Sequence, residues 1–208
     1  PFVAACDDRV TTRRRLVAEH GIDPRQPWLL AVAMMRHDVK LLSFQLLAQA
    51  LERAVDHAWQ ILLVGDGPAR SDVEALFAPF GDRVRFVGIL SGPDLPEIYA
   101  AADLYVWPAC NEAYGMALLE AQAAGVPVVA GMEGGVADVV DAASGCLVSP
   151  RSPAALAEAV RTLLLDPSRR RAMGQAAQAR VRSWHATSVA SARLAAVMAK
   201  LETGMSIG

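Results

Sequence analysis

The sequence predicts an α/β fold: a doubly wound parallel sheet of six strands, Rossmann-like, with extra helices at its C-terminal end. Short apolar runs alternate with amphipathic segments along the chain, as strands and crossover helices do. The runs are continuously apolar, as in WLLAVAM at Trp28–Met34, which is typical of strands buried on both faces of a sheet. Of the 208 residues 53% are hydrophobic, which excludes a disordered chain and suffices for one sizeable core.

The elements follow one another in a regular order. Strands are expected at residues 28–34, 60–65, 84–87, 103–107, 126–130 and 145–148, each a short apolar run. Helices are expected between them, from apolar residues at helical spacing, at 44–55, 71–77, 94–101, 115–124 and 136–141. Ser71 fits an N-cap, because Glu74 follows three residues later. After Pro150 the chain reads as helices over 153–165, 167–182 and 185–201.

The composition excludes several classes of function. A net charge of −2 argues against nucleic acid as a partner, and no apolar run reaches the roughly 20 residues of a membrane-spanning helix. The three cysteines, Cys6, Cys110 and Cys146, are widely spaced, so we expect neither a disulfide framework nor a zinc site. The histidines lack metal-ligand spacing, and no metal site is predicted. The chain starts at Pro1 without a signal-peptide pattern, so we expect a part of a longer cytoplasmic protein.

Ligands of doubly wound sheets bind at the carboxyl ends of the strands. The loop after Met34 contains Arg36 and Lys40 at a helix start, where cations suit phosphate, although for these two residues alone a pair of solvated surface charges is the commoner reading. The loop after Trp107 contains Glu112 and leads through Gly115 into a mostly apolar helix. A carboxylate on such a helix, here Glu120, needs a partner, and the hydroxyls of a bound sugar or ribose would supply one.

Glu112 and Glu120 stand in an E-x₇-E relation within PACNEAYGMALLEAQAAGVPVVA. This segment resembles the nucleotide-binding, C-terminal half of the retaining GT-B glycosyltransferases (group 1, or family 4-like). Further matches follow in the same order along roughly Leu29–His185. They are LLVGDGP, VRFVG, AADLYVWP, GGVADVV and GCLV, followed by LLLDP and Ser183-Trp184 near the C-terminus.

The resemblance implies roles for particular residues. Glu120 would bind the ribose hydroxyls of the donor nucleotide, and Glu112 would lie beside the transferred sugar. Arg36 and Lys40 would stabilise charge on the leaving diphosphate. The backbone of Ala113, Tyr114, Gly115 and Met116 would meet the sugar and pyrophosphate, and Gly88 and Ile89 would border the base. The family needs no metal, and its donor substrate is a nucleoside-diphosphate sugar.

The sequence departs from the family at Arg36 and Lys40. The family reads G-R-L, then K-G a few residues later, whereas here Met35 precedes the arginine and Leu41 follows Lys40. Arg36 is therefore out of register with the arginine of the family pattern.

The resemblance also implies a domain organisation. Residues 1–27 would form an interdomain linker, residues 28–183 the donor-binding domain, and residues 184–208 a helix that crosses toward an N-terminal domain. That missing domain would bind a glycan or lipid acceptor, so we expect this fragment alone to be inactive, and the full-length protein could associate with the inner face of the membrane. Two alternatives stay open: a non-catalytic nucleotide-sugar-binding module, and a UDP-sugar epimerase of GT-B architecture.

The remaining residues of note are expected to be structural. The runs Arg13-Arg14-Arg15 and Arg169-Arg170-Arg171 read as solvated helix faces. Met34 and Met35 read as core, and the four tryptophans, Trp28, Trp59, Trp107 and Trp184, as packing residues.

Overall fold

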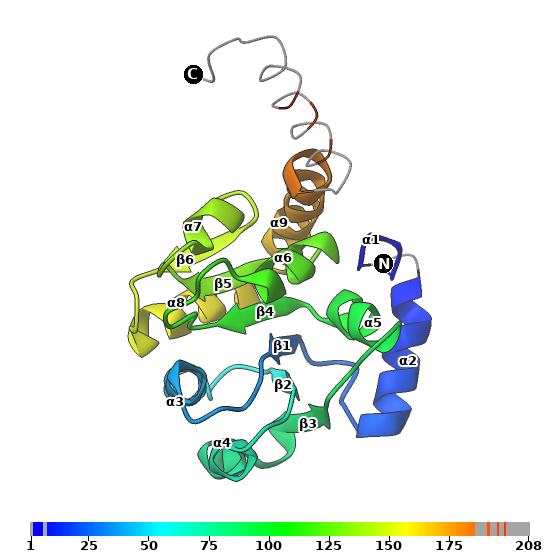
Figure 1. The fold of residues 1–208 in the computed structure, drawn as a ribbon. Coiled ribbons are helices and arrows are strands. Elements are labelled where there is room, and N and C mark those ends of the chain that lie inside the picture. The colour runs from blue at the N-terminus through cyan, green and yellow to red at the C-terminus, as the bar shows by residue number, and fades with distance from the viewer. Residues whose placement is uncertain (1, 6–7, 186–190, 192–194, 196–197, 199–208) are drawn as a thin grey trace.

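Six parallel strands form one sheet in the order β3-β2-β1-β4-β5-β6, which confirms the predicted doubly wound class (Figure 1). The computed structural model describes residues 2–5, 8–185, 191, 195 and 198. The strands are β1 Trp28–Val32, β2 Gln60–Val64, β3 Val84–Gly88, β4 Leu104–Trp107, β5 Val128–Gly131 and β6 Gly145–Val148. The helices are α1 Phe2–Ala5, α2 Arg9–His20, α3 Val39–Glu52, α4 Arg70–Phe77, α5 Asp94–Ala101, α6 Met116–Ala123, α7 Val136–Val139, α8 Pro153–Leu165 and α9 Pro167–Arg180, with a 3₁₀ helix η2 Ala78–Arg83 and a π-helical turn η3 Val181–His185.

Helices cover both faces of the sheet. On one face α3 packs against α4 and α8, and on the other α5, α6 and α9 pack in sequence, with α2 outside α5 (Figure 1). The largest buried side chains are aromatic, and Phe44 of α3 meets Trp107 of β4 edge to face with ring centroids 5.1 Å apart. The strands are buried because both faces are covered, which explains their continuous apolar sequences.

The central pair of strands, β1 and β4, joins the two halves of the sheet. β1 pairs with β2 over five residues, from Trp28 opposite Gln60 to Val32 opposite Val64. β1 pairs with β4 at only two positions, where Leu29 lies opposite Leu104 and Leu30 opposite Tyr105. The chain turns in opposite directions on leaving these two strands, so the loops that follow them diverge.

Several local predictions were wrong. Ser71 lies inside α4, whose N-cap is Ala69 without a side-chain hydrogen bond. Helix α3 begins at Val39, earlier than expected, because the Asp38 side chain caps it by accepting the N–H of Lys40 at 2.7 Å. Met34 is 57% exposed and Trp184 is 56% exposed, so neither is core, whereas the other three tryptophans are buried. The predicted helix 185–201 lies almost entirely outside the described residues.

The arginine runs are also not simple solvated faces. Arg13 of α2 donates to the Asp103 carboxylate at 3.1 Å and lies 3.8 Å over the ring of Trp28. Arg170 of α9 is 9% exposed and donates to the carbonyls of Leu163 and Leu164 at the end of α8. Helix α2 is therefore docked on the domain. Within the part of the chain that the structure describes, no helix combines the length and apolarity needed to cross a membrane.

Candidate functional site

The loops that follow β1 and β4 both lie at the carboxyl edge of the sheet, at the point where the strand order reverses. In an open α/β sheet this reversal of strand order is where ligands bind, because the two loops diverge and leave a crevice between them. Lys40, in the first turn of α3, reaches Glu112 in the loop after β4 with Nζ 2.8 Å from Oε2. Their side chains are only 19% and 20% exposed. The sequence placed both residues at this edge, and the structure brings them into direct contact.

Arg36 is not part of that contact. Its Nε lies 3.1 Å from Oδ2 of Asp38, and the two side chains are 46% and 42% exposed. Asp38 also caps α3, so the arginine is held beside the helix start by its own loop. The expected pairing of Arg36 with Lys40 on one ligand therefore requires Arg36 to leave Asp38, a weak surface pair.

The loop between β4 and α6 has an unusual backbone. Ala109 and Asn111 have φ angles of +58° and +50°, in the left-handed region that non-glycine residues seldom adopt. The loop is held by Ser43 of α3, whose buried hydroxyl accepts the N–H of Cys110 at 3.2 Å. Such strain is kept only where the surroundings impose it, and it commonly marks functional loops. The fixed loop presents Glu112 toward Lys40.

Gly134 allows a second loop to close on the first. A Cβ at Gly134, where φ is +63°, would stand 2.0 Å from the carbonyl oxygen of Glu112. The following residue, Gly135, donates its N–H to that same carbonyl at 3.3 Å. Glycine is therefore required after β5, because the backbone there lies against the backbone of the loop after β4. This contact holds the backbone of Glu112 in place.

Glu120 lies on α6, half-buried, and accepts a hydrogen bond from the hydroxyl of Tyr99 at 2.9 Å. Burial raises the pKa of Glu120, and the Tyr99 hydrogen bond lowers it by a smaller amount. Burial likewise raises the pKa of Tyr99, so the phenol stays a donor. The carboxylate that the sequence identified thus has one protein partner and a partly exposed side.

Both carboxylates act on a second buried tyrosine. Tyr105 of β4 donates its hydroxyl to the carbonyl of Val32, at the end of β1, at 3.3 Å. Burial raises its pKa, and the charges of Glu120 and Glu112 raise it further. Tyr99 stacks against it with ring centroids 5.9 Å apart. The two glutamates therefore share one electrostatic environment above the junction of β1 and β4.

The other predicted residues line the same edge. Gly115 is the N-cap of α6 with φ +86° and no side-chain cap. The N–H of Leu118 donates to the Gly115 carbonyl at 3.0 Å, so the amides that α6 can offer to another acceptor are those of Met116 and Ala117. Ala113 lies against Gly135, and Tyr114 and Met116 are 41% and 57% exposed. Gly88 ends β3, and Ile89 after it is 76% exposed.

Sequence reasoning missed three supports of the site. Tyr99 lies 21 residues from Glu120, and its only sequence clue was that a buried carboxylate needs a donor. Ser43 lies just before the helix that the sequence predicted at 44–55, and nothing in the sequence indicated its contact with the loop after β4. Glu133 accepts the Asn111 N–H and pairs with Arg151 at 2.7 Å; the Arg151 hydrogen bond is the main reason that its pKa lies below the usual range.

The arrangement combines a cation, two carboxylates and a free helix N-terminus. Lysine and uncapped amides bind phosphate oxygens, and carboxylates accept hydrogen bonds from vicinal hydroxyls. Among the residues that the structure describes, no group of three or more His, Cys, Asp or Glu side chains is placed to hold a metal ion. The chemistry available is thus recognition of a molecule that carries both phosphate and hydroxyl groups.

Comparison with known proteins gives a consistent family. The sequence profile described as "Glycosyl transferases group 1" matches residues 26–166. The chain is 36% identical over 201 residues to a D-inositol 3-phosphate glycosyltransferase of Salinispora tropica, covering 89% of this chain and 41% of that protein. It is 36% identical over 146 residues to a GDP-mannose-dependent monoacylated alpha-(1-6)-phosphatidylinositol monomannoside mannosyltransferase of Corynebacterium glutamicum, covering 67% and 38%.

A solved structure supports the same family. Sucrose-phosphate synthase of Thermosynechococcus elongatus superimposes with a TM-score of 0.80 at 28% identity, over 94% of this chain and 49% of that one. The chain thus spans less than half the length of the curated relatives described above.

Proposed function

The chain belongs to the group 1 glycosyl transferases, and from this premise we propose that it is the donor-binding domain of a retaining enzyme. The donor is a nucleoside-diphosphate sugar, and the acceptor is a glycan or lipid. The observation that carries the proposal is the contact of Lys40 with Glu112 where the strand order reverses. One named relative depends on GDP-mannose, which supports a nucleoside-diphosphate sugar as donor.

In this proposal each residue acts on a different part of the donor. The ammonium of Lys40 moves from Glu112 to the diphosphate and stabilises the negative charge of the leaving group. Release from Lys40 frees the Glu112 carboxylate for the hydroxyls of the transferred sugar. The exposed side of Glu120 accepts the ribose hydroxyls, and the uncapped amides of α6 meet the pyrophosphate. Arg36 binds the phosphates only after its ion pair with Asp38 is broken.

The proposed domain organisation follows the same reasoning. Residues 28–183 form the donor domain, residues 1–27 connect it to a preceding acceptor domain, and residues 184–208 cross back toward that domain. The acceptor named for the mannosyltransferase relative is a lipid, which supports a lipid acceptor and a peripheral position of the full-length protein at the cytoplasmic face of a membrane. The isolated chain then binds nucleotide without transferring sugar.

Calorimetric titration with UDP, GDP and ADP tests the donor site. Removal of two ribose hydrogen bonds in Glu120→Ala should weaken binding by about 5- to 150-fold, at about 0.5–1.5 kcal/mol for each bond. Lys40→Gln should weaken a nucleoside diphosphate more than the matching nucleoside, because only the diphosphate engages the ammonium. Glu158→Ala is the matched control, since that side chain is 72% exposed on α8, away from the site.

Two outcomes would refute the donor assignment: no nucleotide binds at millimolar concentration, or Glu120→Ala binds as the wild type does. Assays of the full-length protein with a sugar nucleotide then distinguish a transferase from the two alternatives. Transfer to an acceptor that is lost in Glu112→Ala supports the transferase. Isomerised sugar without an acceptor supports an epimerase, and binding without turnover supports a non-catalytic module.

A further inference from the structure

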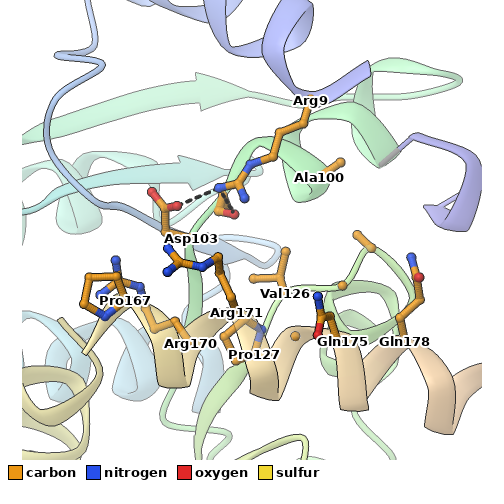
Figure 2. A pocket seen from close by; sticks show the side chains of 14 residues that line it. Arg9, Ala100, Asp103, Val126, Pro127, Pro167, Arg170, Arg171, Gln175 and Gln178 are labelled. Carbon is orange, nitrogen blue, oxygen red and sulfur yellow. Dashed lines mark hydrogen bonds and ion pairs between the residues drawn. The ribbon is translucent and has the colours of Figure 1, made fainter. Parts of the chain in front are cut away.

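A second cavity lies at the opposite, amino edge of the sheet. It has a volume of about 340 Å³, within the range of small-molecule sites, at its lower end. Its walls come from α2, the end of α5, the segment between α6 and β5, and α9. Figure 2 shows Arg9 entering from one side, and Arg170, Arg171, Gln175 and Gln178 from α9 on the other. Lys40, Glu112 and Glu120 do not line it.

The charges of this cavity do not balance. Three arginines, Arg9, Arg170 and Arg171, line it against one aspartate, Asp103, which leaves a net charge of +2. The Asp103 carboxylate already accepts hydrogen bonds from Arg9 at 2.6 Å and from Arg13 at 3.1 Å, so it does not pair directly with Arg170 or Arg171. It also accepts the backbone N–H of Trp28 at 2.8 Å. A partly enclosed excess of positive charge favours an anion as occupant.

The cationic wall is rigid as well as charged. Arg170 is fixed by hydrogen bonds to the carbonyls of Leu163 and Leu164, where the negative end of the α8 dipole stabilises it. Burial lowers the pKa of Arg170. The charge of Asp103 opposes this shift, and the like charges of Arg171 and Arg9 add to it. Within the described chain, the Nε of Arg9 is buried and has no hydrogen-bond partner. Asp103 therefore neutralises only part of the positive charge of this wall.

Arg171 and Gln175 complete the lining from the exposed side of α9. Both are exposed, and a second hollow, which continues past Gln175 and Gln178 to Arg182, extends the space along the helix. A guanidinium is well suited to phosphate, and carboxamides are suited to hydroxyl groups. The volume of the cavity leaves room beside a phosphate for a hydroxyl-bearing skeleton.

We propose that this cavity binds a small phosphomonoester with a hydroxyl-bearing skeleton, of the size of a hexose phosphate. Its phosphate lies between Arg171 and Arg9, with the field of Arg170 behind it, and its hydroxyls face Gln175. The site is separate from the nucleotide site, so the proposal does not depend on the donor assignment. Occupancy would join α2 to α9 through one ligand and so stabilise the fold.

The test is a titration of the 208-residue chain with glucose 6-phosphate, inorganic phosphate and glucose, followed by the amide NMR signals of Gly125 and Gly174, which line the cavity. We expect saturable shifts with glucose 6-phosphate, weaker binding of inorganic phosphate and none of glucose. Arg171→Gln should weaken binding about tenfold, the effect of one charge-assisted contact. Arg169→Gln is the matched control, because Arg169 is exposed on the same helix but does not line the cavity.

Saturating UDP distinguishes this site from the donor site. Binding of glucose 6-phosphate should be unchanged by UDP and by Glu120→Ala. The proposal is overturned if the two arginine variants lose affinity equally, if UDP competes, or if the shifts fall at Gly88 and Gly115 instead. It is also overturned if inorganic phosphate binds as tightly as the sugar phosphate, or if glucose 6-phosphate gives no saturable shifts.

Discussion

Replacing Tyr99 by phenylalanine removes the hydroxyl that donates to Glu120 at 2.9 Å and leaves a buried ring of nearly the same shape. A hydrogen bond to an ionised group contributes about 1.5–3 kcal/mol when buried. Glu120 is half-buried, so water replaces part of the lost hydrogen bond, and we expect Tyr99→Phe to lower the free energy of unfolding by about 1 kcal/mol. If the tyrosine orients Glu120 for the ribose, Tyr99→Phe weakens UDP binding about fivefold.

The same variant has a distinct pH dependence. Burial raises the pKa of Glu120 and the Tyr99 bond offsets part of this, so loss of the bond raises the pKa further. Only the ionised carboxylate accepts both ribose hydroxyls, and UDP affinity in the variant should therefore fall at a higher pH as the solution is acidified. A folded-state pKa above the unfolded value stabilises the fold below the unfolded pKa, and this stabilisation is lost as pH rises through the folded pKa. The stability deficit of Tyr99→Phe should accordingly grow with pH.

Calorimetry with UDP at several pH values between about pH 5 and pH 8, together with urea denaturation, measures both effects. The matched control is Tyr105→Phe, which also removes a buried hydroxyl but leaves the bond between Tyr99 and Glu120 intact. The reasoning is refuted if Tyr105→Phe weakens UDP as much as Tyr99→Phe does, or if the affinity of Tyr99→Phe follows the wild-type pH curve.

Two further substitutions test the supports of the fold and site. Asp103→Asn takes one carboxylate from two arginines and should lower the free energy of unfolding by about 2 kcal/mol, less than for a fully buried pair because one arginine is 40% exposed. Burial alone would raise the pKa of Asp103, but the arginines hold it below the usual value. The stabilisation by Asp103 is therefore present at neutral pH and disappears as the pH falls below about 3.8. Urea denaturation at several pH values, with the exposed Asp82→Asn as control, should find that the stability deficit of Asp103→Asn shrinks in acid. Gly134→Ala should destabilise by more than about 2 kcal/mol, because its Cβ would meet the Glu112 carbonyl at 2.0 Å. Gly92→Ala, with φ +59° and open space around it, should lose only the roughly 1 kcal/mol of left-handed backbone strain, and equal losses would contradict the steric argument.

The sequence predicted the architecture well because strands that are buried on both faces of a sheet have continuously apolar sequences. Strand β6 and helices α5 and α8 begin and end where the apolar patterns indicated. The first strand ends at Val32, earlier than predicted, since Ala33 and Met34 are apolar but belong to the loop, where Met34 faces solvent. Hydrophobicity alone does not distinguish a strand end from an apolar rim at a ligand edge.

The site was predictable in its location but not in its contacts. The position of Lys40 and Glu112 after neighbouring strands follows from the strand order, which fixes the edge where both lie. The partner of Arg36 does not follow, because Asp38 captures it locally. Arg13 was misread for a related reason: a run of charges looks solvated, and its partner Asp103 is 90 residues away.

The long-range bonds of Asp103 also impose an order on folding during synthesis. Arg9 and Asp103 are 94 residues apart, and β1 meets β4 only after β2 and β3 have been made. A ribosome adds about 5–20 residues per second, so α2 waits roughly 5–20 s for the carboxylate that docks it. During this time the amino end of β1 remains uncovered, which is a period of exposure to chaperones or to premature pairing with other chains. The arginines of α2 then close the amino end of the domain, long after they themselves were synthesised.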